Sequence, residues 1–179
     1  HPVKHSRSPE LFNHLFNFYE KNAVYLYLEQ NNIGAAVDIV KNLPMRGISV
    51  TLPHKVSILD YIDELDPQAR LLGCVNTVIH QNGKLFGYNF DGKGAVTALE
   101  NRDKDWYKKK ILLLGSGGAC RAIALHMVSS QQIAELGFVV RDETKAQGLL
   151  TDVEKYVETT RVYTFKDLDA ADVAKNEDL

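Results

Sequence analysis

The sequence predicts an α/β protein in which a mixed α/β domain precedes a domain with a parallel sheet. Two observations lead to this fold class. Helix-spaced and strand-spaced apolar residues alternate along the first half of the chain. Further on, an apolar run at 111–114 leads through glycines into a helical pattern over 119–128. A strand, a glycine turn and a helix in that order are typical of a parallel sheet covered by helices.

Composition and charge narrow the partners of the chain. Its 179 residues, 45% of them hydrophobic, are enough for one large or two small domains. A formal net charge of -2 favours a small-molecule partner over nucleic acid or a membrane. Cys74 and Cys120 stand far apart and outside any zinc-like cluster, so we expect neither disulfides nor a metal. Without a long apolar run or a signal peptide, we expect a cytoplasmic protein, monomeric or homodimeric.

The polar opening His-Ser-Arg-Ser-Pro at 5–9 places two hydroxyls ahead of a proline. Ser8 followed by Pro9 predicts an N-cap and the first residue of a helix that runs to about 21. Five apolar residues at helical spacing predict one buried stripe, namely Leu11, Phe12, Leu15, Phe16 and Tyr19. For Ser8 a cap and a ligand contact are equally good interpretations, whereas for Ser6 we favour contact.

A half-buried strand is predicted over 23–29, because Val24, Leu26 and Leu28 alternate with more polar neighbours. The pattern then gives a helix over 33–43 and a strand over 47–52. The next helix begins at Pro53, which places Lys55 at the carboxyl end of that strand, where α/β folds bind ligands. On position alone a solvated surface lysine is the more ordinary interpretation.

Residues 75–89 predict a hairpin, since Asn82-Gly83 is the strongest signal for a two-residue turn. Antiparallel pairing would bring Asn76, near the start of one arm, close to Asn89 and Asp91 after the other. These side chains either satisfy their own turns or line a pocket for a polyhydroxylated ligand.

The second domain is predicted as a βαβ unit. Helix 92–101 and a charged segment precede it, and we place the boundary between a first domain over 1–103 and a second over 104–179. After the strand at 111–114, strands at 137–141 and 161–165 flank a helix over 145–157. About three strands are predicted here, with none over 170–179, whereas a Rossmann-like sheet has two βαβαβ halves. We therefore expect the chain to be incomplete.

The glycine turn is the strongest candidate for a ligand site in this domain. Its residues, which would lie against a phosphate at the helix start, are Gly115, Ser116, Gly117, Gly118 and Ala119. The turn departs from G-x-G-x-x-G because Cys120 stands at the third glycine position. An ordinary tight turn with no ligand is the alternative interpretation.

Several segments together resemble the ordered motifs of shikimate dehydrogenases. They are the residues at 5–9, Ser49-Val-Thr-Leu-Pro-His-Lys55, Gly73-Cys-Val-Asn-Thr77, Gly87-Tyr-Asn-Phe-Asp-Gly92 and the glycine turn at 115–119. The resemblance covers the chain to about residue 145. It implies a substrate-binding domain, a nicotinamide-binding domain, and the reversible NADPH-dependent reduction of 3-dehydroshikimate to shikimate.

The resemblance also implies roles for individual residues. Lys55 and Asp91 match the catalytic pair of the family, and the contacts to substrate hydroxyl and carboxylate groups match Ser6, Ser8, Thr51 and Asn76. A lysine suits ketone reduction, because hydride transfer leaves an alkoxide that must take up a proton. Two positions depart from the family pattern, Ser49 where asparagine is usual and Phe90 where threonine is usual.

The identity of the cofactor depends on the end of the strand at 137–141. Arg141 would pair with the 2′-phosphate of NADP, whereas Asp142 and Glu143 would accept from the free ribose hydroxyl of NAD. We favour NADP. Two alternatives stay open: a dehydrogenase that acts on quinate with NAD, and a ligand-binding relative without catalysis.

Overall fold

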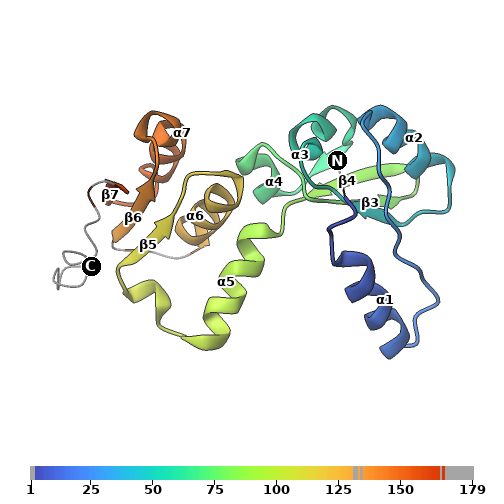
Figure 1. Ribbon diagram of the computed structural model, residues 1–179, viewed down its shortest axis with the longest axis horizontal. Coiled ribbons are helices and arrows are strands. Elements are labelled where there is room, and N and C mark those ends of the chain that lie inside the picture. The colour runs from blue at the N-terminus through green and yellow to red at the C-terminus, as the bar shows by residue number, and fades with distance from the viewer. Residues whose placement is uncertain (1–2, 131–132, 134, 166, 168–179) are drawn as a thin grey trace. The chain divides into compact units, whose positions relative to one another are not determined.

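The computed structural model describes residues 3–130, 133, 135–165 and 167 (Figure 1). The chain divides into two compact units, His1–Tyr88 and Asn89–Leu179. The expectation for 170–179 lies outside the described residues.

A four-stranded mixed sheet organises the first unit. Its strands follow the order β1 (Gly47–Ser49), β3 (Thr77–Gln81), β4 (Lys84–Tyr88) and β2 (Glu64–Leu65). β3 runs antiparallel to both β1 and β4, and β2 runs parallel to β4. Asn82 and Gly83 join β3 to β4 with φ values of 53° and 74°, which confirms the predicted turn. β1 ends at Ser49, before the predicted end at 52.

Short helices pack around this sheet and close the core of the first unit. They are α2 (Ile33–Asn42), α3 (His54–Ser57), the 3-10 turn η1 (Ile58–Tyr61) and α4 (Pro67–Leu72). The side chain of Asn32 accepts from the first turn of α2, and Asp66 does the same for α4. The buried core consists of Val37, Val40, Val50, Ile58, Ala69, Val75, Val78 and Leu85.

Helix α1 (Ser8–Phe18) differs from its prediction in two ways. Arg7 holds the N-cap position, so Ser8 is the first helical residue, and the Ser8 N–H donates to Ser6 Oγ at 3.3 Å. The predicted buried stripe is wrong, because Leu11 and Tyr19 are 56% and 61% exposed. Pro9 is the buried residue of this helix.

The segment predicted as a strand over 23–29 is not one. Its backbone is fixed by a side chain instead: Asn13 Nδ2 donates to the Tyr25 carbonyl at 3.0 Å, and the Tyr25 N–H donates to Asn13 Oδ1 at 2.8 Å. Val24 and Leu26, which were expected on a buried face, are 69% and 71% exposed. The predicted strand and its predicted buried face are both wrong, because no strand among the described residues pairs with this segment.

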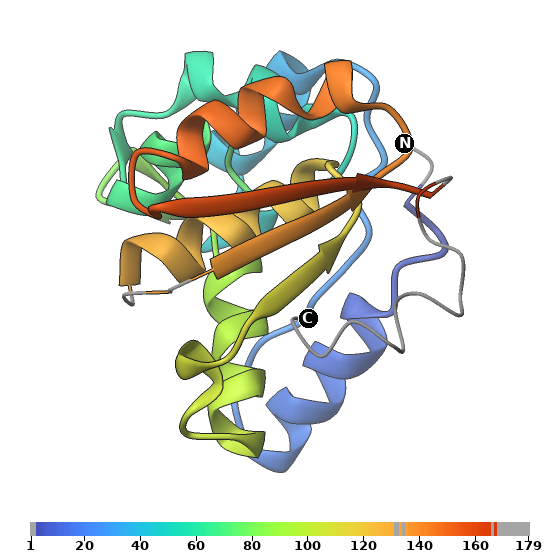
Figure 2. The same ribbon diagram turned by 90° about the vertical axis from the view of Figure 1, so that its left-hand side faces the viewer.

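Three parallel strands form the second sheet, in the order β5 (Ile111–Leu114), β6 (Glu135–Val140) and β7 (Thr159–Thr164), and Figure 2 shows them side by side. α6 (Gly118–Ser130) and α7 (Glu143–Val153) connect them, which confirms the predicted βαβ order and the fold class. An ion pair of 2.5 Å between Arg121 and Asp152 joins the two helices.

Helix α5 (Asp91–Arg102) belongs to the second compact unit. Gly92 lies so close to α6 that a Cβ there would overlap the Ala122 carbonyl oxygen. This packing explains why the compact units divide after Tyr88. The boundary at 103/104 is a functional division between substrate and nucleotide domains, and it stays a prediction.

Candidate functional site

Backbone hydrogen bonds gather predicted substrate residues at one edge of the first sheet. The Val50 N–H donates to the Asn76 carbonyl at 2.7 Å, and the Val75 N–H donates to the Lys55 carbonyl at 2.8 Å. The Asn76 N–H donates in turn to the Tyr88 carbonyl at 2.9 Å. Because β3 is antiparallel to its neighbours, its start lies beside the ends of β1 and β4. Lys55 and Asn76 therefore share this edge.

The turn from β1 into α3 positions Lys55. The His54 N–H donates to the Thr51 carbonyl at 2.9 Å, and the His54 ring bonds through Nε2 to the Gln30 carbonyl at 2.8 Å. Lys55 is half-buried and Thr51 is exposed. Asn76 is half-buried, and its Oδ1 accepts from Thr77 Oγ1 at 2.9 Å. Hydrogen bonds of His54 and of the Lys55 carbonyl therefore fix the turn that carries the lysine.

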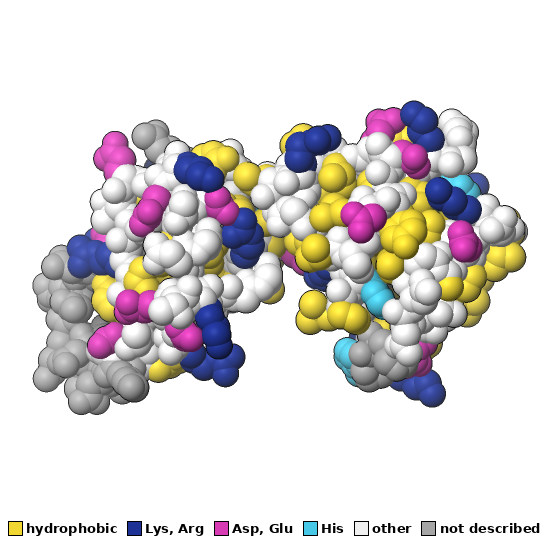
Figure 3. Space-filling model, turned by 90° about the horizontal axis from the view of Figure 1, so that it is seen from above, with side chains coloured by type: hydrophobic (Ala, Val, Ile, Leu, Met, Phe, Trp, Pro, Cys, Tyr) yellow, Lys and Arg dark blue, Asp and Glu magenta, His cyan; other side chains and the backbone are white. Residues whose placement is uncertain are grey.

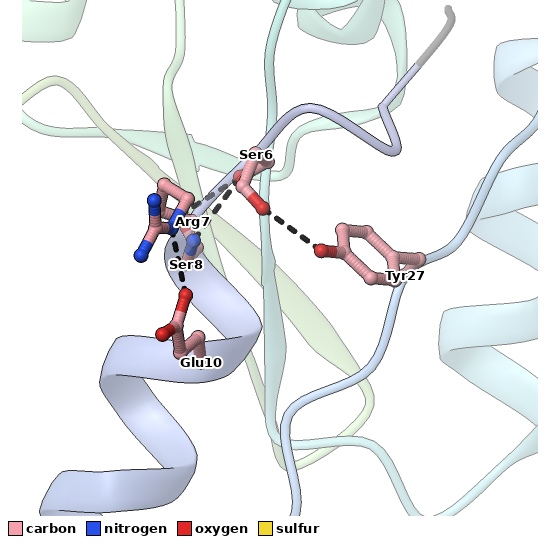
Figure 4. Close-up of polar contacts among 5 residues, drawn as sticks. All are labelled: Ser6, Arg7, Ser8, Glu10 and Tyr27. Carbon is pink, nitrogen blue, oxygen red and sulfur yellow. Dashed lines mark hydrogen bonds and ion pairs between the residues drawn. The ribbon is translucent and has the colours of Figure 1, made fainter.

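The predicted hydroxyl contacts, Ser6 and Ser8, lie in a small hydrogen-bonded turn that leads into α1, where Ser8 is the first helical residue (Figure 4). Ser6 Oγ donates to Ser8 Oγ at 3.2 Å, and both serines are half-buried. Arg7, between them, pairs through Nε with Glu10 at 2.7 Å on the exposed side. Tyr27 donates its hydroxyl to the Ser6 carbonyl at 2.8 Å. Sequence reasoning missed Tyr27, because it assigned that residue to the polar face of a strand.

Asp91 is the first residue of α5, and its N–H donates to Asn89 Oδ1 at 3.1 Å. Asn89 is a buried polar residue, 3% exposed. Lys55 and Asp91 belong to different compact units, so their predicted pairing stays a prediction.

The glycine turn joins β5 to α6 in the predicted manner. Gly115 has a φ of 105°, which favours glycine, and its N–H donates to the Val139 carbonyl at 2.7 Å. A Cβ built on Gly117 or Gly118 would meet no atom within 4 Å. Packing therefore does not require these glycines, and the space over the start of α6 suits a phosphate held by helix N–H groups.

Cys120 points back into the turn. Its thiol donates to the Gly115 carbonyl at 3.0 Å, and burial raises the pKa of the thiol. A protonated thiol is the form that can donate, so the residue at the third glycine position stabilises the turn.

The end of β6 lies beside the glycine turn, because Val139 accepts from Gly115 and Arg141 follows two residues later. Arg141 is exposed. Asp142 caps α7: its Oδ1 accepts from the Thr144 N–H at 3.0 Å and from Thr144 Oγ1 at 2.5 Å. Lys145 Nζ lies 3.6 Å from its other oxygen. These partners, the Thr144 hydroxyl first, hold the pKa of Asp142 below its usual value.

The role of Asp142 as the N-cap of α7 was not recognised from the sequence. The Asp-x-Thr spacing at a helix start is the signal that would have identified the cap. The described residues contain no cluster of three or more His, Cys, Asp or Glu placed to hold a metal ion. No helix among them is long and apolar enough to cross a membrane.

Comparisons with known proteins agree with this arrangement. Residues 1–78 match the model of the shikimate dehydrogenase substrate binding domain. The NADP(+) shikimate dehydrogenase of Bacillus cytotoxicus is 42% identical over 159 residues, which are 87% of this chain and 57% of that protein.

Solved structures share the fold. Shikimate 5-dehydrogenase from Listeria monocytogenes, in complex with shikimate and NAD, has a TM-score of 0.85 at 29% identity. The alignment covers 97% of this chain and 61% of that one. The ligand-free 5-ketofructose reductase of a Gluconobacter strain has a TM-score of 0.83 at 30% identity, covering 92% and 60%.

This chain thus spans about three-fifths of the length of these relatives, 57% to 61%. Within that span the residues at 5–9, the turn that carries Lys55 and the glycine turn at 115–119 follow one another in the order given by the resemblance. The sequence identity extends across both compact units, since 87% of the chain aligns with the Bacillus relative. Residues 1–78 therefore carry the substrate-binding domain of the shikimate dehydrogenase family, and 87% of the chain is similar to a member of that family.

Proposed function

We propose that the protein carrying this chain is an NADP-dependent shikimate dehydrogenase that reversibly reduces 3-dehydroshikimate to shikimate. The observation that carries the proposal is the gathering of Lys55 and Asn76 at one sheet edge through backbone bonds of 2.7 to 2.9 Å. Its relative with 42% identity is named for the same reaction. We place the enzyme in the cytoplasm, as a monomer or homodimer; the two free cysteines, Cys74 and Cys120, suit the reducing conditions of that compartment.

Lys55 and Asp91 supply the proton chemistry in this proposal. When bound, the nicotinamide ring supplies the hydride for the substrate carbonyl. The Lys55 ammonium donates its proton to the oxygen that becomes an alkoxide, and the reverse reaction returns that proton to the amine. Asp91 follows Tyr88 by three residues, and its carboxylate holds the ammonium in the productive position.

The substrate is bound through the hydroxyl and amide side chains of Ser6, Ser8, Thr51 and Asn76. Hydroxyl and amide groups both donate and accept, which suits a ligand that carries several hydroxyls. The serine pair and the Asn76 edge both lie in the first compact unit. That unit also contains the residues matched by the substrate-binding family model, 1–78.

NADP is supported by the different surroundings of Asp142, which caps α7, and Arg141, which is exposed. Asp142 already accepts from Thr144 at 3.0 and 2.5 Å and lies near Lys145, so its carboxylate belongs to the start of α7. Arg141 is exposed at the end of β6 and suits a 2′-phosphate. Gly115, Ser116, Gly117, Gly118 and Ala119 hold the pyrophosphate at the start of α6 in this proposal.

The test is a two-by-two assay of reduced nicotinamide formation, with shikimate or quinate and NADP or NAD. We expect the highest kcat/KM with shikimate and NADP. A higher value with quinate or with NAD would replace the substrate or the cofactor in the proposal. No turnover in any mixture would favour a ligand-binding protein that keeps the fold.

A further inference from the structure

We propose that Tyr27 is a positioning residue for substrate binding, whose hydroxyl fixes the main chain at Ser6 and so orients the hydroxyls of Ser6 and Ser8. This inference rests on the proposed function, because the serines matter only if they meet the substrate. Tyr27 itself acts through the loop and needs no contact with the ligand.

The hydroxyl of Tyr27 is a long-range tether for the loop. It donates to the Ser6 carbonyl at 2.8 Å across 21 positions of sequence (Figure 4). The other bonds described for Ser6 are local: its N–H donates to the Val3 carbonyl at 3.0 Å, and its Oγ bonds to Ser8. Local bonds set the shape of the loop, whereas the Tyr27 bond sets its place against the remainder of the unit.

The segment that carries Tyr27 is itself anchored on α1. Asn13 makes two hydrogen bonds, of 3.0 and 2.8 Å, to the backbone of Tyr25. The Phe12 ring stacks on the Tyr25 ring, with centroids 4.9 Å apart and planes 8° from parallel. Tyr25 lies two residues before Tyr27, so the anchor at Tyr25 also restricts where Tyr27 can lie.

These contacts close a ring of connections. From Ser6 the chain enters α1 at Ser8, α1 holds Tyr25, and Tyr27 returns to Ser6. The serine hydroxyls are therefore held in place because the segment with Ser6 and α1 is bonded to the segment with Tyr25 and Tyr27 at two points. Because these contacts order the loop before the substrate binds, less conformational entropy is lost on binding and the affinity is higher.

Packing does not account for Tyr27. Its side chain is 49% exposed, so the ring contributes less to the core than a buried aromatic residue would. The side chain of Arg7 does not take over the role of the Tyr27 hydroxyl, because it forms an exposed ion pair with Glu10. The hydroxyl is thus the part of Tyr27 that carries the inference.

The experiment compares Tyr27→Phe with the wild-type protein that carries this chain. Loss of one hydrogen bond should raise the KM for shikimate about threefold to tenfold. The kcat and the KM for NADP should stay within about twofold, because the chemical step and the nucleotide site are untouched. Tyr19→Phe, an exposed tyrosine at the end of α1, is the matched control and should leave all constants unchanged.

Thermal unfolding of the variants provides a readout besides activity. A Tyr27→Phe protein with unchanged KM and an active wild type would overturn the inference and leave the proposed function intact. A fall in kcat without a rise in the KM for shikimate would also overturn it, since positioning of Ser6 and Ser8 predicts a change in shikimate binding. Absence of turnover and of shikimate binding in the wild type would overturn the proposed function, and the inference with it.

Discussion

Gly92 of α5 lies directly against the main-chain carbonyl of Ala122 in α6. A Cβ at this position would overlap that oxygen and the Cβ of His126. Because Asp91 immediately precedes Gly92, this contact fixes the start of α5 against the helix that follows the glycine turn. The proposed catalytic carboxylate and the proposed phosphate-binding helix are therefore parts of one packed unit.

Gly92→Ala should destabilise the protein by about 1–3 kcal/mol, because the clash is with backbone and the helices must separate. Gly94→Ala is the matched control in the same helix, where a Cβ meets nothing within 4 Å. That change should stabilise the protein by up to about 1 kcal/mol through helix propensity. Urea unfolding measures both; equal effects of the two variants would contradict the close approach of α5 and α6.

Lys55→Ala should lower kcat by about 10²- to 10⁴-fold, the usual contribution of a general acid, with a much smaller change in KM. Lys41→Ala, which removes an exposed lysine from the last turn of α2, serves as control. Steady-state kinetics with shikimate and NADP give both constants. A rise in KM alone would mean that Lys55 binds the substrate without transferring a proton.

Arg141→Ala should raise the KM for NADP about tenfold to a hundredfold through loss of a charge-assisted hydrogen bond. The KM for NAD should change little, because NAD lacks the 2′-phosphate. Arg102→Ala, at the end of α5, removes an exposed arginine elsewhere in the same unit. If Arg141→Ala weakened both cofactors equally, Arg141 would contact a part of the nucleotide that they share.

Acid should weaken the second unit through His126. Its Nδ1 is buried without a hydrogen bond in the structure. Burial, with Lys93 as a second cause and Glu100 opposing, lowers the pKa of His126. The unfolded chain therefore takes up the proton first, so stability falls as the pH drops below about 6.5.

His126→Gln should reduce this pH dependence. Urea midpoints at about pH 7 and pH 5.5 should differ less in the variant than in the wild type. His14→Gln, at an exposed position of α1, is the control and should behave as the wild type. An unchanged pH dependence in His126→Gln would show that other groups cause the acid sensitivity.

Local signals predicted the elements whose hydrogen bonds are local. The Asn82-Gly83 turn follows from the chemistry of its own two residues. The strand–turn–helix order from Ile111 to Ser130 could be read for the same reason.

Long-range partners could not be read in this way. The alternation over 23–29 is that of a strand, yet a strand needs a neighbour, and here the backbone of Tyr25 bonds to the Asn13 side chain. The apolar spacing of α1 likewise predicted a buried face without showing what would cover it. The α5 helix joined the second unit because Gly92 permits a contact with α6 that periodicity does not encode.

The bonds from Asn13 to Tyr25 have a consequence for self-association. Val24 and Leu26 are 69% and 71% exposed in a segment that pairs with no strand among the described residues, and exposed apolar residues of this kind favour aggregation. On the edge that Tyr25 faces, both backbone groups are already occupied by the Asn13 amide. A strand from a neighbouring molecule must first displace this amide, so a single helical side chain protects that edge of the segment against fibril-like growth.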